Sequence, residues 1–431
     1  SALSPRKLSK DFQTNIALLG LEERNLQERF AQKVQECLQG ETISFIQAQT
    51  GIGKTYGYLL PALSLEHEEG ILLSVPTKTL QNQVMQEDAK RLEEIFHIST
   101  HSLKGPQNYL KLDAFHATLE EEESNRLYTR FKMQLLVWLT ETDTGDLDEI
   151  GQLYRYQQFL PNLVHDGNLH KDSLFWLEDF WRRGQDKARS CKLLVTNHAY
   201  LLTRLEDDPS LLEGRLLILD EAQKILLTLE NLSRKSYLLT DLLEQLDQAL
   251  STEEVMLERR LLESIRFELS YLLEQFLSGK RKMCPASSID KLRQDFSELN
   301  LPEFKDYQRF FSSEGEFWLS VSELSSKKIE ITSSRNQRLL FSQIFPESCQ
   351  LLGISATLEI SSRVSLPELL GFPQANIYYL DEQFQENQEI LLVNDFPLVT
   401  EVSLEEYAQA VVEVLEELFQ FEEPILVLFT A

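Results

Sequence analysis

The fold of this chain is indicated most directly by residues 43–60, which read ISFIQAQTGIGKTYGYLL. An apolar run suited to a buried strand comes first, and a helix-compatible run comes last. Between them, Gly51 and Gly53 let backbone N–H groups turn inward on an anion, and the following helix N-terminus adds partial positive charge. The pattern is typical of a phosphate-binding loop, with Lys54 directed at the β- and γ-phosphates and the Thr55 hydroxyl at Mg²⁺.

The loop departs from the usual pattern at its first glycine, which is Ala48 here. A plain glycine turn would not also place Lys-Thr at a helix start, so we keep the nucleotide-binding interpretation. The residues expected around the nucleotide are Ala48, Thr50, Gly51, Ile52, Gly53, Lys54 and Thr55. The implied cofactors are ATP and Mg²⁺.

The composition is that of a globular chain with more than one domain, because its 431 residues are 42% hydrophobic and 26% charged. Acidic residues predominate, with 42 Lys+Arg against 69 Asp+Glu and a formal charge of −27. A net field of that sign repels nucleic acid at long range, although a local basic channel remains compatible with it.

The sequence shows neither a targeting signal nor a cysteine spacing typical of a disulfide or metal site. No apolar run is long enough to span a membrane and no charged-then-apolar leader opens the chain, so we expect no membrane partner and a cytoplasmic location. The four cysteines, Cys37, Cys191, Cys284 and Cys349, form no Cys-x-x-Cys pair, which indicates reduced packing residues. The first residue is Ser, as expected for a trimmed or excised segment of a longer polypeptide.

Further apolar runs suit the strands of a parallel sheet buried on both faces. They are Ile71–Val75, Leu193–Thr196, Leu216–Leu219 and Leu351–Ser355, with helical stretches between them. The alternation predicts an α/β fold with a parallel sheet.

Two mainly helical insertions are expected to interrupt this lobe, at residues 105–190 and 226–325. In the second, Ser251–Glu254 is predicted to be a capping box, and the apolar stripe Leu257–Phe276 a packing face between helices. The lobe itself is assigned residues 1–104, 191–225 and 326–375. Residues 376–431 are predicted to begin a second, incomplete lobe, with strands at Ile377–Leu380, Ile390–Val393 and Ile425–Phe429 and a capping box at Ser403–Glu406.

The run Leu216–Leu219 delivers Asp220 and Glu221 to the carboxyl end of a strand, where open parallel sheets bind ligands. Asp220 suits holding Mg²⁺ through water, and Glu221 suits polarising an attacking water. The candidate catalytic residues are therefore Lys54, Asp220 and Glu221, and the candidate magnesium ligands are Thr55 and Asp220. Such a pair is also common as a helix cap, but the phosphate loop in the same sheet favours the functional interpretation.

Several short segments occur in an order that resembles a known family. They are RFAQ (29–32), the loop 48–55, VPTKTLQ (75–81), KGPQNYL (104–110), VTNHAYLL (195–202), DEAQ (220–223) and SATL (355–358). The set resembles the DinG/XPD-like superfamily-two DNA helicases, most closely the bacterial DinG branch. The resemblance covers residues from about 25 to the C-terminus. It implies two RecA-like lobes and 5′ to 3′ action on single-stranded, forked or structured DNA. It also implies two first-lobe insertions: a domain that often carries an iron-sulfur cluster, and a helical arch.

The resemblance also implies roles at the nucleotide. Gln32 would contact adenine, with Arg29 supporting the site. Ser355 and Thr357 would couple the nucleotide state to the grip on DNA. Gln223 stands where the family usually has histidine, and we expect altered coupling rather than lost hydrolysis.

For DNA, the resemblance points to Thr77, Thr79 and Gln81, because hydroxyl and amide groups suit sequence-blind phosphate contact. Helix capping and surface solvation explain each of these residues nearly as well. His198 follows the family pattern, and an ordinary structural histidine explains it equally well.

The cluster cysteines of the family are missing. Lys111 stands where relatives have the first cysteine, and Cys191 is the one cysteine available before Val195. One thiolate cannot hold a cluster that ordinarily needs four. We therefore expect residues 105–190 to be held by helix packing, without an iron-sulfur cluster.

The family's arginine finger, which belongs to the second lobe, does not follow Phe429-Thr430. Because such a residue is worth orders of magnitude in hydrolysis rate, the expectation is nucleotide binding with little turnover by this chain alone. Basic and aromatic residues also interleave at 154–156, 180–183 and 307–310, where either base stacking or core packing is possible.

Three functions are compatible with the sequence. The leading one is an ATP-dependent DNA helicase or translocase acting in repair or replication. The second is a protein that acts mainly as a nuclease through an exonuclease domain outside this segment. The third is an ATP-gated DNA clamp that binds without turnover.

Overall fold

The computed structural model describes residues 7–40, 42–65, 70–120, 124–168, 171–252, 255–313, 315–322, 325–335, 340–361, 364–380, 396–397 and 402–418. The chain divides into two compact units, residues 1–380 and 381–431. Among the helices of the described residues, none is both long and apolar enough to cross a bilayer.

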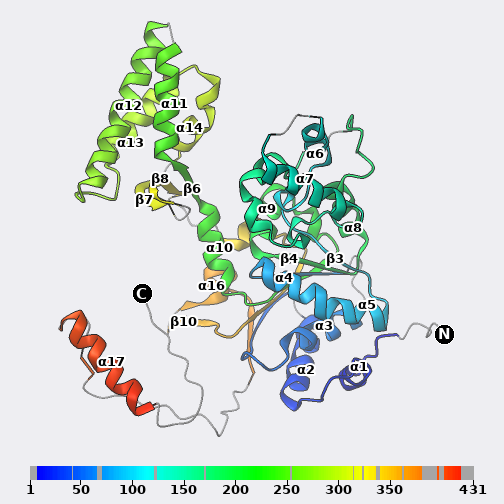
Figure 1. The fold of residues 1–431 in the computed structure, drawn as a ribbon. Helices are drawn as coiled ribbons and strands as arrows, with labels where there is room; N and C mark the ends of the chain where they lie inside the picture. The colour runs from blue at the N-terminus through cyan, green and yellow to red at the C-terminus, as the bar shows by residue number, and fades with distance from the viewer. Residues whose placement is uncertain are drawn as a thin grey trace. The chain divides into compact units, whose positions relative to one another are not determined.

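A seven-stranded sheet organises the first unit, in the order β12-β1-β9-β5-β2-β4-β3. Every neighbouring pair in it is parallel. Two of its strands, β3 and β4, are labelled side by side in Figure 1. The strands are β1 (Ile43–Gln47), β2 (Gly70–Val75), β3 (Thr100–Ser102), β4 (Leu193–Asn197), β5 (Arg215–Leu219), β9 (Gln350–Ser355) and β12 (Asn376–Tyr379). The predicted α/β class is confirmed, and each apolar run assigned to this sheet forms a strand.

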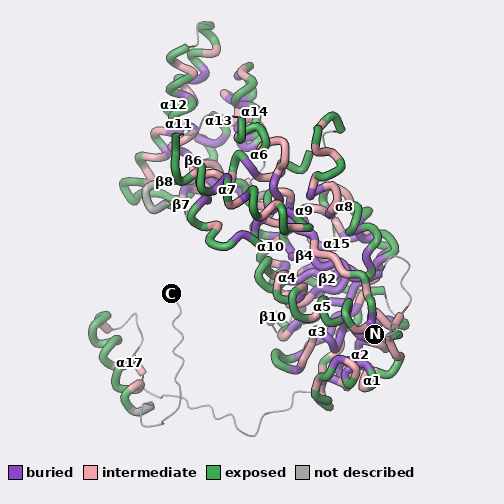
Figure 2. The backbone as a smooth tube through the Cα atoms, turned by 45° about the vertical axis from the view of Figure 1, so that its right-hand side comes forward, coloured by how far each residue is buried: buried purple, intermediate pink, exposed green. Residues whose placement is uncertain are grey.

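Alternating strand residues supply two separate cores, one on each face of the sheet. On β2, Ile71 and Leu73 belong to one core, and Leu72 belongs to the other. Helices α1 to α5 cover the first face, and α8, α9, α10, α15 and α16 cover the second. In Figure 2 the strands β2 and β4 accordingly lie in buried parts of the chain, coloured purple. This two-sided burial explains why the strands are continuous apolar runs in the sequence.

The helices of this lobe are α1 (Phe12–Leu18), α2 (Asn25–Gly40), α3 (Lys54–Ser64), α4 (Lys78–Val84), α5 (Lys90–Phe96), α8 (Phe180–Ser190), α9 (His198–Asp207), α10 (Lys224–Ser233), α15 (Phe341–Ile344) and α16 (Leu366–Leu370). A π-helical turn, Met85–Ala89, joins α4 to α5. A short hairpin is formed by β10 (Glu359–Ser361) and β11 (Val364–Ser365).

The first insertion is largely helical, as the sequence predicts. It contains α6 (Leu112–Leu119), α7 (Arg126–Leu139) and a 3₁₀ segment, Leu153–Asn162. These elements close over their own small core, whose buried members include Phe115, Phe131, Leu135 and Tyr156.

In its described residues, the second insertion contains the helices α11 to α14 and a sheet that the sequence interpretation missed. The helices are α11 (Leu239–Thr252), α12 (Met256–Leu277), α13 (Ala286–Glu298) and α14 (Lys305–Phe311). The sheet is antiparallel, in the order β6 (Arg234–Leu238), β8 (Ser325–Arg335), β7 (Gly315–Ser322). Because β8 lies in this sheet, the boundary expected at 325/326 moves to residue 335.

The predicted packing stripe on α12 is largely confirmed. Leu261, Ile265, Leu269 and Leu272 are buried, whereas Leu257 is exposed. The proposed capping box at Ser251–Glu254 lies partly outside the described residues.

The boundary expected at 375/376 is also corrected, because β12 pairs in parallel with β1 and the first unit extends to Leu380. In the second unit, α17 (Leu404–Leu418) begins at the predicted capping box. There Glu406 N donates to Ser403 Oγ over 3.2 Å, and Ser403 N donates to Glu406 Oε2 over 3.0 Å. The strands expected at Ile390–Val393 and Ile425–Phe429 lie outside the described residues.

Candidate nucleotide-binding site

The loop between β1 and α3 has a backbone suited to holding phosphate. Gly51 and Gly53 have φ values of 84° and 80°, a region that residues with a side chain rarely adopt. Gly53 precedes α3 and no side chain caps the helix there, so the first amides of α3 lack that partner. Lys54 and Thr55 occupy the first positions of α3. An anion placed here would meet backbone donors and the positive end of the helix.

The remaining loop residues differ in burial. Ala48 and Ile52 are buried, and Ala48 N donates to the Ser355 carbonyl over 2.9 Å. Thr50 is exposed. The alanine at the usual glycine position is therefore tied to the end of β9.

Asp220 and Glu221 follow β5 at the same edge of the sheet as the loop. Lys54 Nζ lies 3.5 Å from Glu221 Oε1, which joins the loop to the acidic pair. Glu221 has a φ of 51°, a strained conformation for a residue with a side chain. Burial raises the pKa of Asp220, the neighbouring Glu221 charge adds to the shift, and Lys54 opposes it.

Tyr58 lies beside both candidate magnesium ligands. Its hydroxyl donates to Asp220 Oδ2 over 3.3 Å and lies close to the Thr55 side chain. Burial, followed by the charge of Asp220, raises the pKa of Tyr58 well above its usual value, so the phenol stays protonated. A hydroxyl and a carboxylate held together in this way fit Mg²⁺, which binds proteins through one or two oxygen ligands plus substrate phosphates.

The three residues assigned to coupling lie together. Gln223 Nε2 donates to Glu221 Oε2 over 3.0 Å, and Ser355 Oγ lies 2.7 Å from Gln223 Oε1. Thr357 N donates to Ser355 Oγ over 3.1 Å, so Thr357 joins this hydrogen-bonded group through its backbone N–H. A continuous polar path therefore runs from Glu221 on the β5 side to the segment that follows β9.

The glutamine that contacts the loop is Gln27, not the predicted Gln32. Gln27 is buried and its Nε2 donates to the Gly53 carbonyl over 2.7 Å. Arg24 Nη1 approaches the Gly51 carbonyl at 3.4 Å. Gln32 is exposed and lines a shallow cavity with residues of α1 and the distal part of α3, and no loop residue takes part.

The predicted partner of Gln32, Arg29, is likewise exposed on α2. A signal for the pair that contacts the loop was present, because the spacing Arg-x-x-Gln occurs twice, as Arg24–Gln27 and as Arg29–Gln32. Only the structure distinguishes the two. Gln27 lies on the face of α2 toward the loop, where a Cβ at Gly53 would meet Gln27 Nε2 at 2.3 Å.

Thr77 and Thr79 are exposed after β2, and Thr77 caps α4 by accepting from Leu80 N over 3.2 Å. Gln81 is fully buried, which corrects its assignment to DNA. Its Nε2 donates to the Leu103 carbonyl over 3.0 Å, and its Oε1 accepts from Asn197 Nδ2 over 2.9 Å. Both ends of the amide thus hold α4 against the sheet.

His198 is a buried structural residue. Its Nδ1 lies 2.8 Å from Ser74 Oγ. Burial lowers the pKa of His198 to about 4, so the ring is neutral near pH 7. It ties α9 to the end of β2, close to the acidic pair.

In the first insertion, Lys111 pairs with Asp166 over 2.7 Å. Cys191 is buried at the end of α8, where its thiol donates to the Ala188 carbonyl over 3.5 Å. A protein-only ion pair therefore occupies the position at which the resemblance implies a cluster cysteine. The expected lack of an iron-sulfur cluster stays a prediction.

Most of the interleaved aromatic residues belong to cores. The buried rings are Tyr156, Phe180, Trp181, Tyr307 and Phe310. Tyr154 is 66% exposed, with the Arg155 guanidinium 5.8 Å from its ring centroid. The structure thus favours packing over base stacking for these segments, apart from Tyr154.

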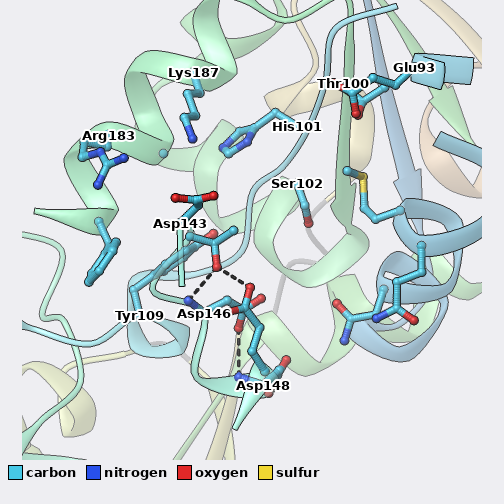
Figure 3. A pocket seen from close by; sticks show the side chains of 17 residues that line it. Glu93, Thr100, His101, Ser102, Tyr109, Asp143, Asp146, Asp148, Arg183 and Lys187 are labelled. Atoms are coloured by element: carbon cyan, nitrogen blue, oxygen red, sulfur yellow. Dashed lines mark hydrogen bonds between the residues drawn. The ribbon is translucent and has the colours of Figure 1, made fainter. Parts of the chain in front are cut away.

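A cavity of about 340 Å³ lies away from the nucleotide loop, between β3 and the first insertion (Figure 3). Arg183 and Lys187 of α8 and His101 of β3 border it, with Asp143 nearby. Among the residues that the structure describes, the buried His101 Nε2 has no hydrogen-bond partner. Burial, followed by the charge of Lys187, lowers the pKa of His101 to about 4.

Comparison with known proteins agrees with this geometry. Residues 25–140 match the DEAD/DEAH box helicase family. The chain is 33% identical over 212 residues to the 3′-5′ exonuclease DinG of Bacillus subtilis (strain 168), a stretch that covers 47% of this chain and 22% of that protein. It is also 33% identical over 215 residues to the 3′-5′ exonuclease DinG of Staphylococcus saprophyticus, covering 48% of this chain and 23% of that protein.

A solved XPD helicase chain aligns with a TM-score of 0.46 and 16% identity, over 83% of this chain and 62% of that one. The matched residues 25–140 include the loop Ala48–Thr55 and are similar to a DEAD/DEAH box helicase domain. More narrowly, the chain is similar over these stretches to DinG proteins, in agreement with the resemblance noted in its sequence. The matched stretches span less than a quarter of the length of these curated relatives.

Proposed function

We propose that this chain is the ATP-binding part of an ATP-dependent DNA helicase or translocase that moves 5′ to 3′ on single-stranded DNA. Its setting would be repair or replication in the bacterial cytoplasm, on single-stranded, forked or structured DNA. The observation that carries the proposal is the 3.5 Å approach of Lys54 Nζ to Glu221 Oε1, which puts the phosphate-binding cation beside the candidate hydrolytic carboxylate.

Hydrolysis would require Lys54 and Glu221 to separate and take new partners when ATP binds. ATP would draw the Lys54 ammonium onto its phosphates, because phosphate oxygens carry more charge than one carboxylate. Glu221 would then be free to orient an attacking water. A Mg²⁺ bound through Thr55 and Asp220 would neutralise charge that develops on the phosphates.

ATP binding and hydrolysis would be coupled to DNA binding through the hydrogen-bonded path from Glu221 through Gln223 to Ser355. A change in the Glu221 environment on ATP binding alters the acceptor available to Gln223 Nε2, and hence the hydrogen bond to Ser355. The exposed hydroxyls of Thr77 and Thr79 are candidates for phosphate contact. With a formal charge of −27, the chain would hold DNA through a few local contacts.

Steady-state ATP hydrolysis by the full-length protein, measured with and without single-stranded DNA, tests the proposal. The expected result is stimulation by DNA that Lys54→Ala abolishes and the exposed-lysine control Lys90→Ala retains. Unwinding of forks with a single 5′ or 3′ tail then tests polarity, since a 5′ to 3′ motor requires the 5′ tail. ATP-dependent DNA retention without stimulated hydrolysis in the full-length protein would instead favour a clamp.

A second candidate function is suggested by the printed name of the relatives, 3′-5′ exonuclease DinG. In that case the lobe would serve a nuclease located elsewhere in the polypeptide. Degradation of labelled single strands without ATP, unaffected by Lys54→Ala in the full-length protein, would favour this function over the motor.

A further inference from the structure

Tyr58 is a fully buried side chain on α3, three residues after Thr55. Residues at this spacing share one face of a helix, which explains how the Tyr58 hydroxyl reaches both Thr55 and the end of β5. It donates to Asp220 Oδ2 over 3.3 Å. Tyr58 is therefore the residue of α3 through which the phosphate-loop helix contacts the acidic pair from inside the core.

The Asp220 carboxylate is held from two sides. Oδ1 accepts from Glu221 N over 3.0 Å, and Oδ2 accepts from the Tyr58 hydroxyl. Each carboxylate oxygen has two acceptor positions, so one position on each remains for metal-bound water. The two donors fix the direction in which those remaining positions point.

We propose that Tyr58 is a positioning residue for magnesium-dependent nucleotide binding. By holding Asp220 beside Thr55, its hydroxyl forms the two-oxygen ligand pair before metal and nucleotide arrive. Partners of metal ligands commonly change metal affinity by 10–100-fold when they are removed. The inference rests on the proposed nucleotide site and adds a residue that neither contacts the phosphates nor takes part in hydrolysis.

A packing role alone predicts a different outcome. The aromatic ring of Tyr58 fills the core beneath the loop, and Tyr58→Phe keeps that ring while deleting the hydroxyl. If the ring alone matters, Tyr58→Phe should leave nucleotide binding unchanged. A general folding defect should weaken binding whether or not metal is present.

The test is equilibrium binding of a fluorescent ATP analogue, measured in Mg²⁺ and again in EDTA. For Tyr58→Phe the expected result is about 10-fold weaker binding in Mg²⁺, unchanged binding in EDTA, and a Mg²⁺ midpoint about 10-fold higher. The matched control is Tyr56→Phe, the same change two residues earlier, where the hydroxyl lies beside Asp88 rather than Asp220. This control should leave the Mg²⁺ midpoint in place.

A double-mutant cycle with Asp220→Ala completes the test, because Tyr58→Phe should have no further effect on Mg²⁺ dependence once its acceptor is gone. Equal loss in Mg²⁺ and EDTA, no loss in either, or full additivity with Asp220→Ala would each overturn the proposal. Absence of nucleotide binding by the unmodified chain would instead contradict the proposed function on which the inference rests.

Discussion

Gln223 and Ser355 are joined by a 2.7 Å hydrogen bond between the Gln223 side-chain carbonyl and the Ser355 hydroxyl. The other end of the Gln223 amide donates to Glu221, so one side chain spans the candidate hydrolytic residue and the segment after β9. Glutamine can do this because its amide offers a donor and an acceptor at once. We infer that Gln223 carries the link that the family usually assigns to histidine.

Ser355→Ala should uncouple hydrolysis from DNA while sparing ATP binding. We expect nucleotide affinity within about 2-fold of the unmodified chain and DNA-stimulated turnover reduced about 10-fold, the equivalent of one hydrogen bond. Thr357→Ala is the matched control and should have a smaller effect, because Thr357 contacts Ser355 through its backbone. Additive losses for Ser355→Ala and Gln223→Ala would argue against a shared path.

Gln27→Ala should weaken ATP binding, and Gln32→Ala should not. Gln27 donates to the Gly53 carbonyl, whereas Gln32 is exposed away from the loop. The expected loss is about 10-fold for Gln27→Ala, against less than about 2-fold for Gln32→Ala. Repeating the titration with inorganic triphosphate separates adenine contact from support of the loop. A larger effect from Gln32 would restore the original sequence assignment.

Gln81→Ala should lower the stability of the fold, and Thr79→Ala should lower the affinity for single-stranded DNA. Removing the buried amide takes away the acceptor of Asn197 Nδ2 and one of the two donors to the Leu103 carbonyl, worth about 2–3 kcal/mol of unfolding free energy. Thr79 is exposed, so its loss should change stability by less than about 0.5 kcal/mol. Urea denaturation and fluorescence anisotropy with labelled single-stranded DNA measure the two effects. The reverse pattern would contradict the burial of Gln81.

Acid should destabilise the fold through His101 before ordinary carboxylates titrate. Burial, followed by the charge of Lys187, lowers the pKa of folded His101 to about 4 from its ordinary value near 6.5, so the unfolded chain binds the extra proton first as the pH falls. This histidine should contribute no pH dependence above about pH 7 and a loss of about 2 kcal/mol by pH 5. Urea denaturation across that range should show a shallower slope for His101→Gln than for the control His116→Gln, which changes an exposed histidine. Identical slopes would rule out this account of His101.

The sheet was predictable where burial on both faces imposes an unbroken apolar run, as in Leu216–Leu219. The strand β3 was not, because Thr100–Ser102 has no such run and is defined by its pairing with β4. The hairpin of β7 and β8 was missed for a related reason. Polar residues interrupt it, although Phe317 and Leu319 show the two-residue period of a strand and are buried.

The strand-loop-helix conformation of residues 43–60 and the position of Asp220 and Glu221 after a strand were predictable because each is a contiguous segment with a clear residue pattern. Gln27 and Tyr58 were not, because their roles depend on which helix face meets the loop or the end of β5. Gln81 shows the opposite error, since a polar residue beside exposed threonines suggested contact with DNA, and tertiary packing placed it in the core.

The central claim is that residues 48–55 bind the phosphates of ATP, and titration of a fluorescent ATP analogue in Mg²⁺ tests it most directly. We predict saturable binding by the unmodified chain and about 100-fold weaker binding by Lys54→Ala, because the charge-assisted contacts to phosphate are lost. Lys90→Ala should bind as the unmodified chain does. Saturable binding that Lys54→Ala leaves intact, or no binding at all, would contradict the account.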